Sequence, residues 1–200
     1  LREPCLTIIT INRNNGRFLQ RTLDSLTKFR DDRRVECLFV DGASTDCSLD
    51  VAAGFYDLRK IVSEPDSGIY NAMNKGLRRA KGKYLLWLNS GDELKTCAHA
   101  TVMPILAAGT ADLISFGLEM FREGAGTPEI IWRPKTEDLP HHTLPHPTTF
   151  FNRLSLISVF GYCESYKIAG DRDAILKMYY FRRALEIHEE IIGIFYFGGV

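Results

Sequence analysis

Four short polar clusters contain the residue types that could do chemistry in this sequence. They are NRNNG at residues 12–16, DGASTD at 41–46, EPDSG at 64–68 and NSGDE at 89–93. Asn, Asp, Ser and Gly are also common in turns and helix caps, so a single cluster would not indicate a site. Four clusters at one place, with carboxylates at Asp41 and Asp92, would suit a metal-bound phosphate ligand with a nucleoside beside it.

Each cluster follows or adjoins a run of apolar residues that predicts a strand. Strands are predicted at 6–11, 35–40, 60–63 and 84–88, and the spacing of apolar residues predicts helices near 17–29, 47–57 and 68–80. This alternation predicts an open parallel sheet. Ligands of such sheets bind beyond the carboxyl ends of the strands, so we expect the four clusters at one sheet edge.

The pattern changes after residue 110. A hairpin is predicted from 112–121 and 129–133, and a loop rich in Pro and His follows at 134–147 and leads to TTFF at 148–151. Helices are predicted near 152–159 and from Asp171, and a last strand near 187–197. The second half is therefore not a repeat of the first.

Length and composition exclude several classes of protein. The chain has 200 residues, and its 25 basic residues balance 25 acidic ones, so it offers no basic stripe for nucleic acid. Its apolar runs are too short to span a bilayer. The five cysteines fit neither a disulfide framework nor paired metal ligands, which predicts a reducing, cytoplasmic location. The missing initial Met predicts a trimmed chain.

The first cluster excludes the common glycine-rich nucleotide folds. It contains a single Gly, whereas a dinucleotide-binding dehydrogenase needs G-x-G-x-x-G at this position. It also lacks the lysine-ended cradle of a P-loop and the glycine- and arginine-rich loop of sugar nucleotidyltransferases. The phosphate groups of a ligand are therefore expected to be held by a metal ion.

In combination, the motifs resemble glycosyltransferase family 2, and within it the enzymes of bacterial exopolysaccharide and colanic-acid-type biosynthesis. The resemblance rests on TIITINRN (7–14), LFVDGASTD (38–46), SEPDSGIYNAMNKG (63–76), LNSGD (88–92), HPTTFF (146–151) and IAGDRD (168–173). It implies an α/β protein with the GT-A fold, a Rossmann-like and mainly parallel sheet flanked by helices. It also implies transfer from a nucleoside-diphosphate sugar with inversion at the anomeric carbon.

The same resemblance implies one domain over residues 1–200. Residues 1–110 would form the half that binds the nucleotide sugar, and residues 111–200 a mixed half that binds the acceptor and is truncated at its C-terminus. The expected acceptor is a saccharide or a lipid-linked saccharide. A lipid-linked acceptor implies peripheral association with the inner face of the membrane.

Seven side chains would contact substrate by resemblance: Thr10, Asn12, Asp41, Asp66, Lys75, Asn89 and His146. Asp41 would accept hydrogen bonds from the base, with Gly42 in place of the family's second acid. Lys75 would reach the diphosphate, and His146 would hydrogen-bond the leaving diphosphate or the acceptor. An ordinary surface lysine and an ordinary loop histidine are the alternatives.

The fourth cluster stands where the family's Asp-x-Asp metal motif lies. Only Asp92 keeps a carboxylate at a matching position, so Asp92 is the expected ligand of Mn²⁺ or Mg²⁺. One carboxylate suffices when phosphate oxygens and water complete the shell, so the ion should bind weakly without nucleotide. His141, His142 and His146 have neither the spacing nor the acidic partner of a zinc site.

Asp171 is the expected general base. Direct displacement with inversion needs a carboxylate opposite the leaving group to take the acceptor's proton. The resemblance places it at Asp171, with Gly170 in place of the first acid of the family's Glu-Asp pair. Asp173 is the second candidate, and capping of the helix is the alternative role for Asp171.

Two other functions are open from the residues alone. A metal-dependent nucleotidyltransferase would release pyrophosphate, whereas a sugar transferase releases a nucleoside diphosphate. A non-catalytic assembly protein would bind a nucleotide sugar and neither transfer nor hydrolyse it. The sequence does not identify the sugar, the nucleotide or the acceptor.

Overall fold

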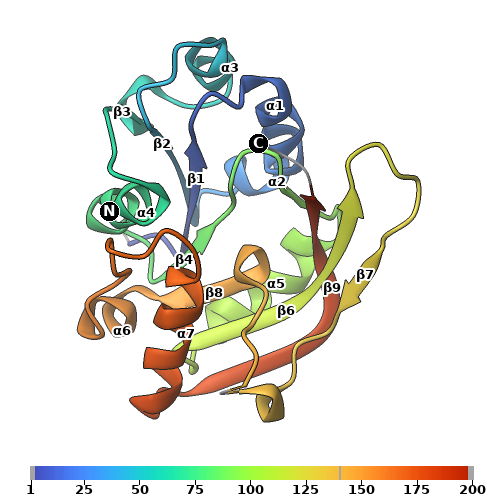
Figure 1. Cartoon of the computed structure of the whole chain (residues 1–200). Coiled ribbons are helices and arrows are strands. Elements are labelled where there is room, and N and C mark those ends of the chain that lie inside the picture. Colours follow the sequence, from blue (N-terminus) through green and yellow to red (C-terminus); the bar gives the residue numbers. More distant parts are fainter. Residues whose placement is uncertain (1–2, 140, 198–200) are drawn as a thin grey trace.

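Nine strands form one mixed sheet in the computed structural model, which describes residues 3–139 and 141–197 (Figure 1). The strand order is β3-β2-β1-β4-β8-β6-β9-β5, with β7 paired to β6. The strands are β1 (Leu6–Asn12), β2 (Val35–Asp41), β3 (Ile61–Ser63), β4 (Tyr84–Trp87), β5 (Glu93–Leu94), β6 (Leu113–Arg122), β7 (Ile130–Trp132), β8 (Thr149–Asn152) and β9 (Leu185–Phe197). The α-helices are α1 (Gly16–Ser25), α2 (Thr27–Arg30), α3 (Ser48–Ala53), α4 (Ile69–Arg79), α5 (Ala98–Ala108), α6 (Arg153–Ser158) and α7 (Gly170–Tyr180), and the short 3₁₀ helices are η1 (Leu58–Lys60), η2 (Thr136–Asp138) and η3 (His146–Thr148).

The four strands predicted in the first half pair in parallel, as expected. β1 lies between β2 and β4, with Asn12 opposite Asp41 at its carboxyl end, and β3 pairs with the outer side of β2. Every residue of β1 and β4 is buried. Burial on both faces is typical of a parallel sheet covered by helices, and it explains the continuous apolar runs in the sequence.

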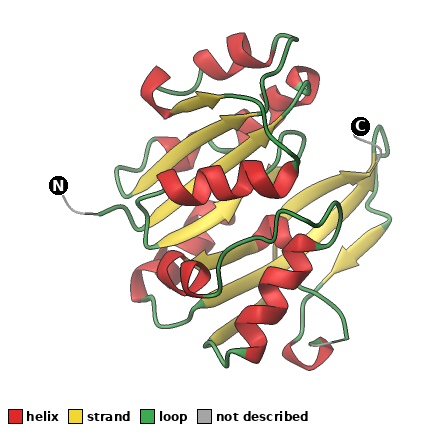
Figure 2. Ribbon diagram, turned by 60° about the vertical axis from the view of Figure 1, so that its left-hand side comes forward, coloured by secondary structure: helices red, strands yellow, loops and turns green. Residues whose placement is uncertain are grey.

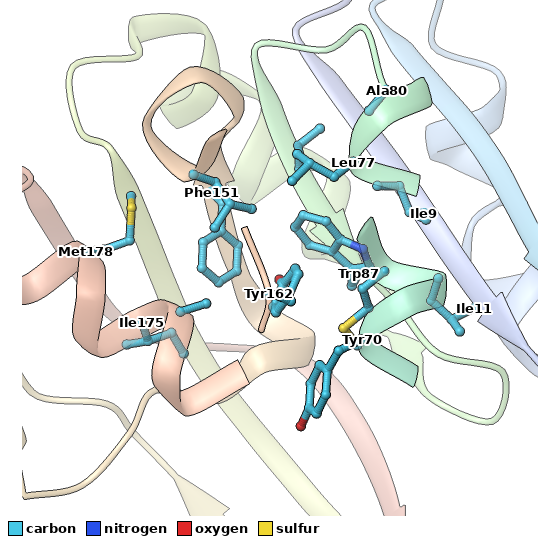
Figure 3. Packing of buried hydrophobic residues seen from close by; sticks show 14 of the residues in the cluster. Ile9, Ile11, Tyr70, Leu77, Ala80, Trp87, Phe151, Tyr162, Ile175 and Met178 are labelled. Carbon is cyan, nitrogen blue, oxygen red and sulfur yellow. The ribbon is translucent and has the colours of Figure 1, made fainter. Parts of the chain in front are cut away.

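Helices cover both faces of the sheet (Figure 2), and hydrophobic clusters lie between them and the strands. Ile9 and Ile11 lie beside α4, in a cluster that also contains Trp87, Phe151 and residues of α6 and α7 (Figure 3). Ile8 faces the opposite way, into a cluster with α2 and α5. Neighbouring residues of a strand point to opposite faces, so β1 contributes to both layers.

The second half of the chain continues the same sheet. β8 is antiparallel to β4 and β6, and β6 is parallel to β9. The predicted hairpin is confirmed, with Leu118 of β6 opposite Trp132 of β7. Pro140 of the predicted loop and residues 198–200 lie outside the described residues. Within the described ranges, no helix is both long enough and apolar enough to cross a membrane.

The helix predicted at 17–29 is divided in the structure. It breaks at Leu26 into α1 and α2, and the hydroxyls of Ser25 and Thr27 donate to backbone carbonyls of the preceding turn. Side-chain hydrogen bonds of this kind compete with those of the helix backbone. The apolar spacing continues through the break, and the sequence pattern therefore predicted one helix.

Two further helices differ from the predictions. The helix predicted at 47–57 is α3, which ends at Ala53 before Gly54 because glycine weakens a helix. Helix α5 was not predicted. It contains Pro104, and proline inside a helix removes a hydrogen bond, so the sequence signal for α5 is weak. Burial of Val102 and Leu106 against the sheet keeps α5 folded.

Candidate active site

Three of the polar clusters line one cavity of about 300 Å³ at the carboxyl ends of the strands. Its polar lining consists of Asn12 at the end of β1, Arg13 and Asn15 in the loop that follows, Asp66 and Gly68 after β3, and Asn89 and Ser90 after β4. Arg13 lies 3.8 Å from the Asp66 carboxylate across this cavity. The structure therefore brings the clusters together at the expected sheet edge.

Asp41 is buried beside this cavity and does not line it. Its Oδ1 accepts hydrogen bonds from Asn12 Nδ2 and Ser44 Oγ, and its Oδ2 accepts from Ser44 N and from Ser63 Oγ at 2.8 Å. The carboxylate therefore joins the ends of β1, β2 and β3. A nucleobase N–H would have to replace one of these donors. Asn12 Oδ1 is buried without a partner among the described residues, so it is an additional acceptor there.

A second cavity of about 210 Å³ adjoins the first, and Ile69 and Asn89 line both. Three titratable side chains from distant parts of the sequence meet there: Asp92, His146 and Asp171. Other walls are apolar and include Leu118, Met120, Trp132 and Phe195 from β6, β7 and β9. The expected metal ligand, the expected base and His146 thus share one cavity.

Asp92 is a buried carboxylate that lacks a full set of partners. It is 5% exposed, and its Oδ2 has no hydrogen-bond partner within the described residues. Burial raises the pKa of Asp92 to about 8, although Arg21 acts in the opposite direction. Arg21 Nε donates to Gly91 O at 2.7 Å, which holds the guanidinium next to this loop. Arg21 was not predicted, because nothing in the sequence distinguishes it from a surface arginine of α1.

The oxygen atoms of this cavity fit a divalent cation. Asn89 Oδ1 is also buried without a described partner, so two residues that line this cavity, Asn89 and Asp92, each have an unpartnered side-chain oxygen. Mn²⁺ and Mg²⁺ prefer such hard oxygen ligands. Across residues 3–139 and 141–197, no three His, Cys, Asp or Glu side chains gather to hold a metal ion. The protein ligands alone therefore form an incomplete site.

His146 is buried in an aromatic environment. Its Nε2 lies 2.8 Å from Tyr162 Oη, and its ring packs near those of Trp87 and Phe151. Burial lowers the pKa of His146 to about 4, against an opposing effect of the Asp171 charge. His146 is therefore a neutral hydrogen-bonding group at neutral pH. His141 and His142 are exposed, so the three histidines do not form a cluster.

Burial of neutral His146 is expected to weaken the protein in acid. Its pKa falls from 6.5 to about 4 on folding, so the unfolded chain binds the proton more tightly. The free energy of unfolding should decrease as the pH falls from 6.5 towards 4, by about 3 kcal/mol for the whole shift. Urea unfolding at neutral pH and near pH 5 measures this decrease. The variant His146→Gln should show a smaller decrease, and an equal decrease would contradict the assignment.

Asp171 lies in the first turn of α7 at the edge of the second cavity. Tyr70 Oη donates to Asp171 Oδ1 at 3.3 Å. A Cβ atom added at Gly170 would lie 2.8–2.9 Å from the Tyr70 ring. The motif resemblance expects an acid at position 170, and Tyr70 of α4 packs where such a side chain would begin. The pairing of Tyr70 with Asp171 was not predicted from the sequence, in which they are far apart.

Gly42 stands where the resemblance expects a second acid. A Cβ atom added at Gly42 would meet the carboxylate of Asp66, which is the end of a side chain and can move aside. Asp66 also accepts a hydrogen bond from Gly68 N at 3.0 Å, which fixes the loop after β3. The carboxylate of Asp66 thus reaches the space next to Asp41 from a different strand.

Replacing Gly170 by Ala is expected to displace the start of α7. The new methyl group would overlap the Tyr70 ring, and overpacking of this kind destabilises a protein by roughly 1–3 kcal/mol. Chemical denaturation measures the change. Gly126→Ala is the matched control, because a Cβ atom added at Gly126 meets no atom within 4 Å. Equal stability of both variants would show that α7 can accommodate the methyl group.

Besides Asp41, two more predicted contact residues line neither cavity. Thr10 is fully buried and accepts a hydrogen bond from Tyr56 Oη at 2.9 Å, on the side of β1 that faces α1 and α3. Lys75 Nζ donates to Pro65 O at 2.6 Å and lies 3.1 Å from Glu64. In this structure, Lys75 supports the loop that carries Asp66.

Comparisons with known proteins agree with this architecture. The uncharacterized glycosyltransferase Rv1514c of Mycobacterium tuberculosis is 30% identical over 180 residues, which cover 87% of this chain and 68% of that protein. The structure of S. aureus TarS 1–349 in complex with UDP-GlcNAc has a TM-score of 0.77 at 17% identity and covers 98% of this chain. The mannosyltransferase PcManGT from Pyrobaculum calidifontis, in complex with GDP-Man and Mn²⁺, has a TM-score of 0.71 at 16% identity and covers 96% of this chain.

This chain spans 59% of the TarS chain and 57% of the PcManGT chain. At these identities the two structures show a shared fold, which is the expected GT-A fold. The model of the family described as Glycosyl transferase family 2 matches residues 7–168. This match includes all four polar clusters and His146, and it ends before Asp171. Since it covers most of the sequence, the chain belongs to glycosyltransferase family 2.

Proposed function

We propose that this protein is an inverting, metal-dependent glycosyltransferase that moves a hexose from a nucleoside-diphosphate sugar to a hydroxyl acceptor. One observation carries the proposal: Asp171 lines the same cavity as Asp92 and Asn89, which each have an unpartnered side-chain oxygen. Such a transfer needs a base for the acceptor and ligands for the donor's metal ion, and the residues of this cavity would supply both.

The adjoining cavity would hold the nucleotide of the donor. Asn12, Arg13 and Asp66 line it, and it connects to the second cavity at Asn89. The UDP-GlcNAc complex of TarS and the GDP-Man complex of PcManGT support a nucleotide-sugar donor, because both proteins share the fold of this chain. In this arrangement the sugar would lie between the nucleotide and Asp171.

Asp92 and Asn89 would hold the metal ion, which, when bound, supplies positive charge to neutralise the diphosphate. The two side chains provide only part of a coordination shell, so the diphosphate oxygens and water must provide the rest. The Mn²⁺ in the PcManGT complex supports this choice of ion. His146 would hydrogen-bond the diphosphate or the acceptor as a neutral group.

Asp171 would act as the general base in a single displacement. The acceptor oxygen forms a bond to the anomeric carbon while its proton moves to the Asp171 carboxylate. The bond from that carbon to the diphosphate oxygen breaks, and the nucleoside diphosphate leaves with the electron pair. Attack opposite the leaving group inverts the anomeric carbon. The hydrogen bond from Tyr70 would orient the carboxylate for this proton transfer.

The biological role follows from the motif resemblance and is part of the proposal. We infer a cytoplasmic enzyme of exopolysaccharide or cell-surface polysaccharide synthesis, with a saccharide or lipid-linked saccharide acceptor. The first half of the chain would bind the donor. Apolar side chains of the second half, including Trp132 and Phe195, would border the acceptor.

A donor screen tests the proposed activity. Nucleotide sugars are added singly with Mn²⁺, thermal shift identifies those that bind, and chromatography identifies the products. Release of a nucleoside diphosphate together with a glycoside of inverted configuration is the expected result. Release of pyrophosphate would indicate a nucleotidyltransferase, and binding without any product from a broad acceptor panel would indicate a non-catalytic protein.

A further inference from the structure

Five large apolar side chains are exposed on α6, on the end of α7 and on the residues that follow these helices. They are Leu154, Ile157, Phe160, Tyr180 and Phe181, here called the α6–α7 surface, and each is at least 45% exposed. The inner residues of α6, Ser155 and Leu156, are buried, so the exposed ones form a separate outer face. Grouped apolar exposure of this kind marks an interaction surface.

The two parts of this surface are held together. Arg183 Nη2 donates to Ser158 Oγ at 2.7 Å, which joins the residues after α7 to the end of α6. Figures 1 and 2 both show α6 beside α7. The two parts of the surface therefore lie side by side.

Phe160 has an unusual backbone conformation for its size. Its φ is 69°, in the left-handed region, and its side chain is 88% exposed. A bulky residue is disfavoured there, whereas Gly or Asn would be tolerated. The exposed apolar ring and the strained backbone both make phenylalanine unfavourable at this position. Strained residues of this kind cluster at functional sites.

The surface is also basic, although the chain as a whole has no net charge. Residues 154–160 and 177–183 contain Lys177, Arg182 and Arg183 and no Asp or Glu. Two carboxylates lie close by, Asp173 paired with Lys177 and Asp112 bonded to Ser155 and Ala184, so a net positive charge remains. Tyr180, Arg182 and Arg183 line a hollow of about 550 Å³ that could accept lipid phosphate.

We propose that the α6–α7 surface docks this protein on a bilayer that contains anionic lipid. Aromatic and aliphatic side chains beside arginines are the composition by which peripheral proteins enter the headgroup region. The exposed Phe160 ring would insert among the lipids, and the arginines would contact phosphates. Asp171 stands at the opposite end of α7, about 14 Å along the helix axis from Tyr180. The cavity of Asp171 would therefore be held near the membrane.

Sedimentation with vesicles tests the proposal. The full chain should sediment with phosphatidylcholine vesicles that contain phosphatidylglycerol, sediment much less with pure phosphatidylcholine, and be released by salt. Phe160→Asn should weaken vesicle binding about tenfold, because the variant lacks the ring that would be buried in the bilayer. The same variant should raise the melting temperature, because Asn tolerates the left-handed conformation. If Phe160 had only a structural role, its replacement would not weaken vesicle binding while raising the melting temperature.

Two variants serve as comparisons. Leu58→Ser removes an apolar side chain that is 73% exposed beside Arg59 and Lys60, outside the α6–α7 surface, and it should bind vesicles like the wild type. Arg182→Gln should weaken binding to the anionic vesicles. Because no nucleotide sugar is present, these results do not depend on the proposed activity.

Three outcomes would overturn the proposal. The first is equal binding to neutral and anionic vesicles, and the second is unchanged binding by Phe160→Asn. The third is a dimer in solution that Phe160→Asn dissociates, which would assign the surface to a second copy of this chain. Analytical ultracentrifugation of the wild type and the variant detects that dimer.

Discussion

Replacing Asp171 by Asn is expected to lower turnover by about 10²–10⁴, or about 3–5 kcal/mol of transition-state stabilisation. Asparagine has nearly the same shape, can accept the hydrogen bond from Tyr70, and suits the start of a helix about as well. It cannot take the acceptor's proton. The variant should therefore keep its melting temperature and its affinity for the donor nucleotide while losing the chemical step.

Asp173→Asn is the matched control for this experiment. Asp173 lies in the same first turn of α7, and its carboxylate is 2.7 Å from Lys177 Nζ. Its replacement should leave turnover within a few fold of the wild type. Normal turnover by Asp171→Asn, with a large loss in Asp173→Asn, would move the role of base to Asp173. Asp171 makes no side-chain cap hydrogen bond, and the N-cap of α7 is Ala169. Normal turnover by both variants would therefore remove both carboxylates from the role of base.

Replacing Asp92 by Asn should abolish most of the stimulation of donor binding by Mn²⁺ and lower turnover by about 10² or more. Asp92 is the expected protein carboxylate at the metal, and a neutral amide binds the ion more weakly. The fold should not suffer, because burial already favours the neutral form of the Asp92 carboxyl near pH 7, and asparagine is neutral and has nearly the same shape. Calorimetry with nucleoside diphosphate, with and without Mn²⁺, measures the effect.

Glu93→Gln controls for the loss of a neighbouring charge. Glu93 follows Asp92 directly, and its carboxylate accepts a hydrogen bond from Tyr196 Oη at 2.7 Å. This variant should retain stimulation by Mn²⁺. In the wild type, Mn²⁺ alone should bind weakly, because the described residues supply an incomplete shell. Tight binding of Mn²⁺ without nucleotide, or full stimulation in Asp92→Asn, would be incompatible with this metal site.

The sequence by itself determined the parallel first half of the sheet and the edge at which the site lies. Short apolar runs separated by helical patterns are local signals, and β1 and β4 carry them in continuous form because both faces are buried. The polar clusters are also local signals in the sequence, since each follows or adjoins the end of its own strand. Helix α5 could not be predicted in this way, because Pro104 removes the local signal while burial against the sheet maintains the helix.

Only the tertiary structure decided how the site residues are paired. The packing of Tyr70 on Gly170 joins segments that no periodicity connects, and it occupies the space of the side chain that the motif resemblance expects at position 170. Likewise, the sequence predicted that Asp41 accepts hydrogen bonds from a nucleobase. In the structure its oxygens accept hydrogen bonds that join three strand ends. The physical reason is that the burial, the pKa and the hydrogen-bond partners of a side chain depend on which distant residues surround it. Those residues come together only when the sheet and its helices have packed.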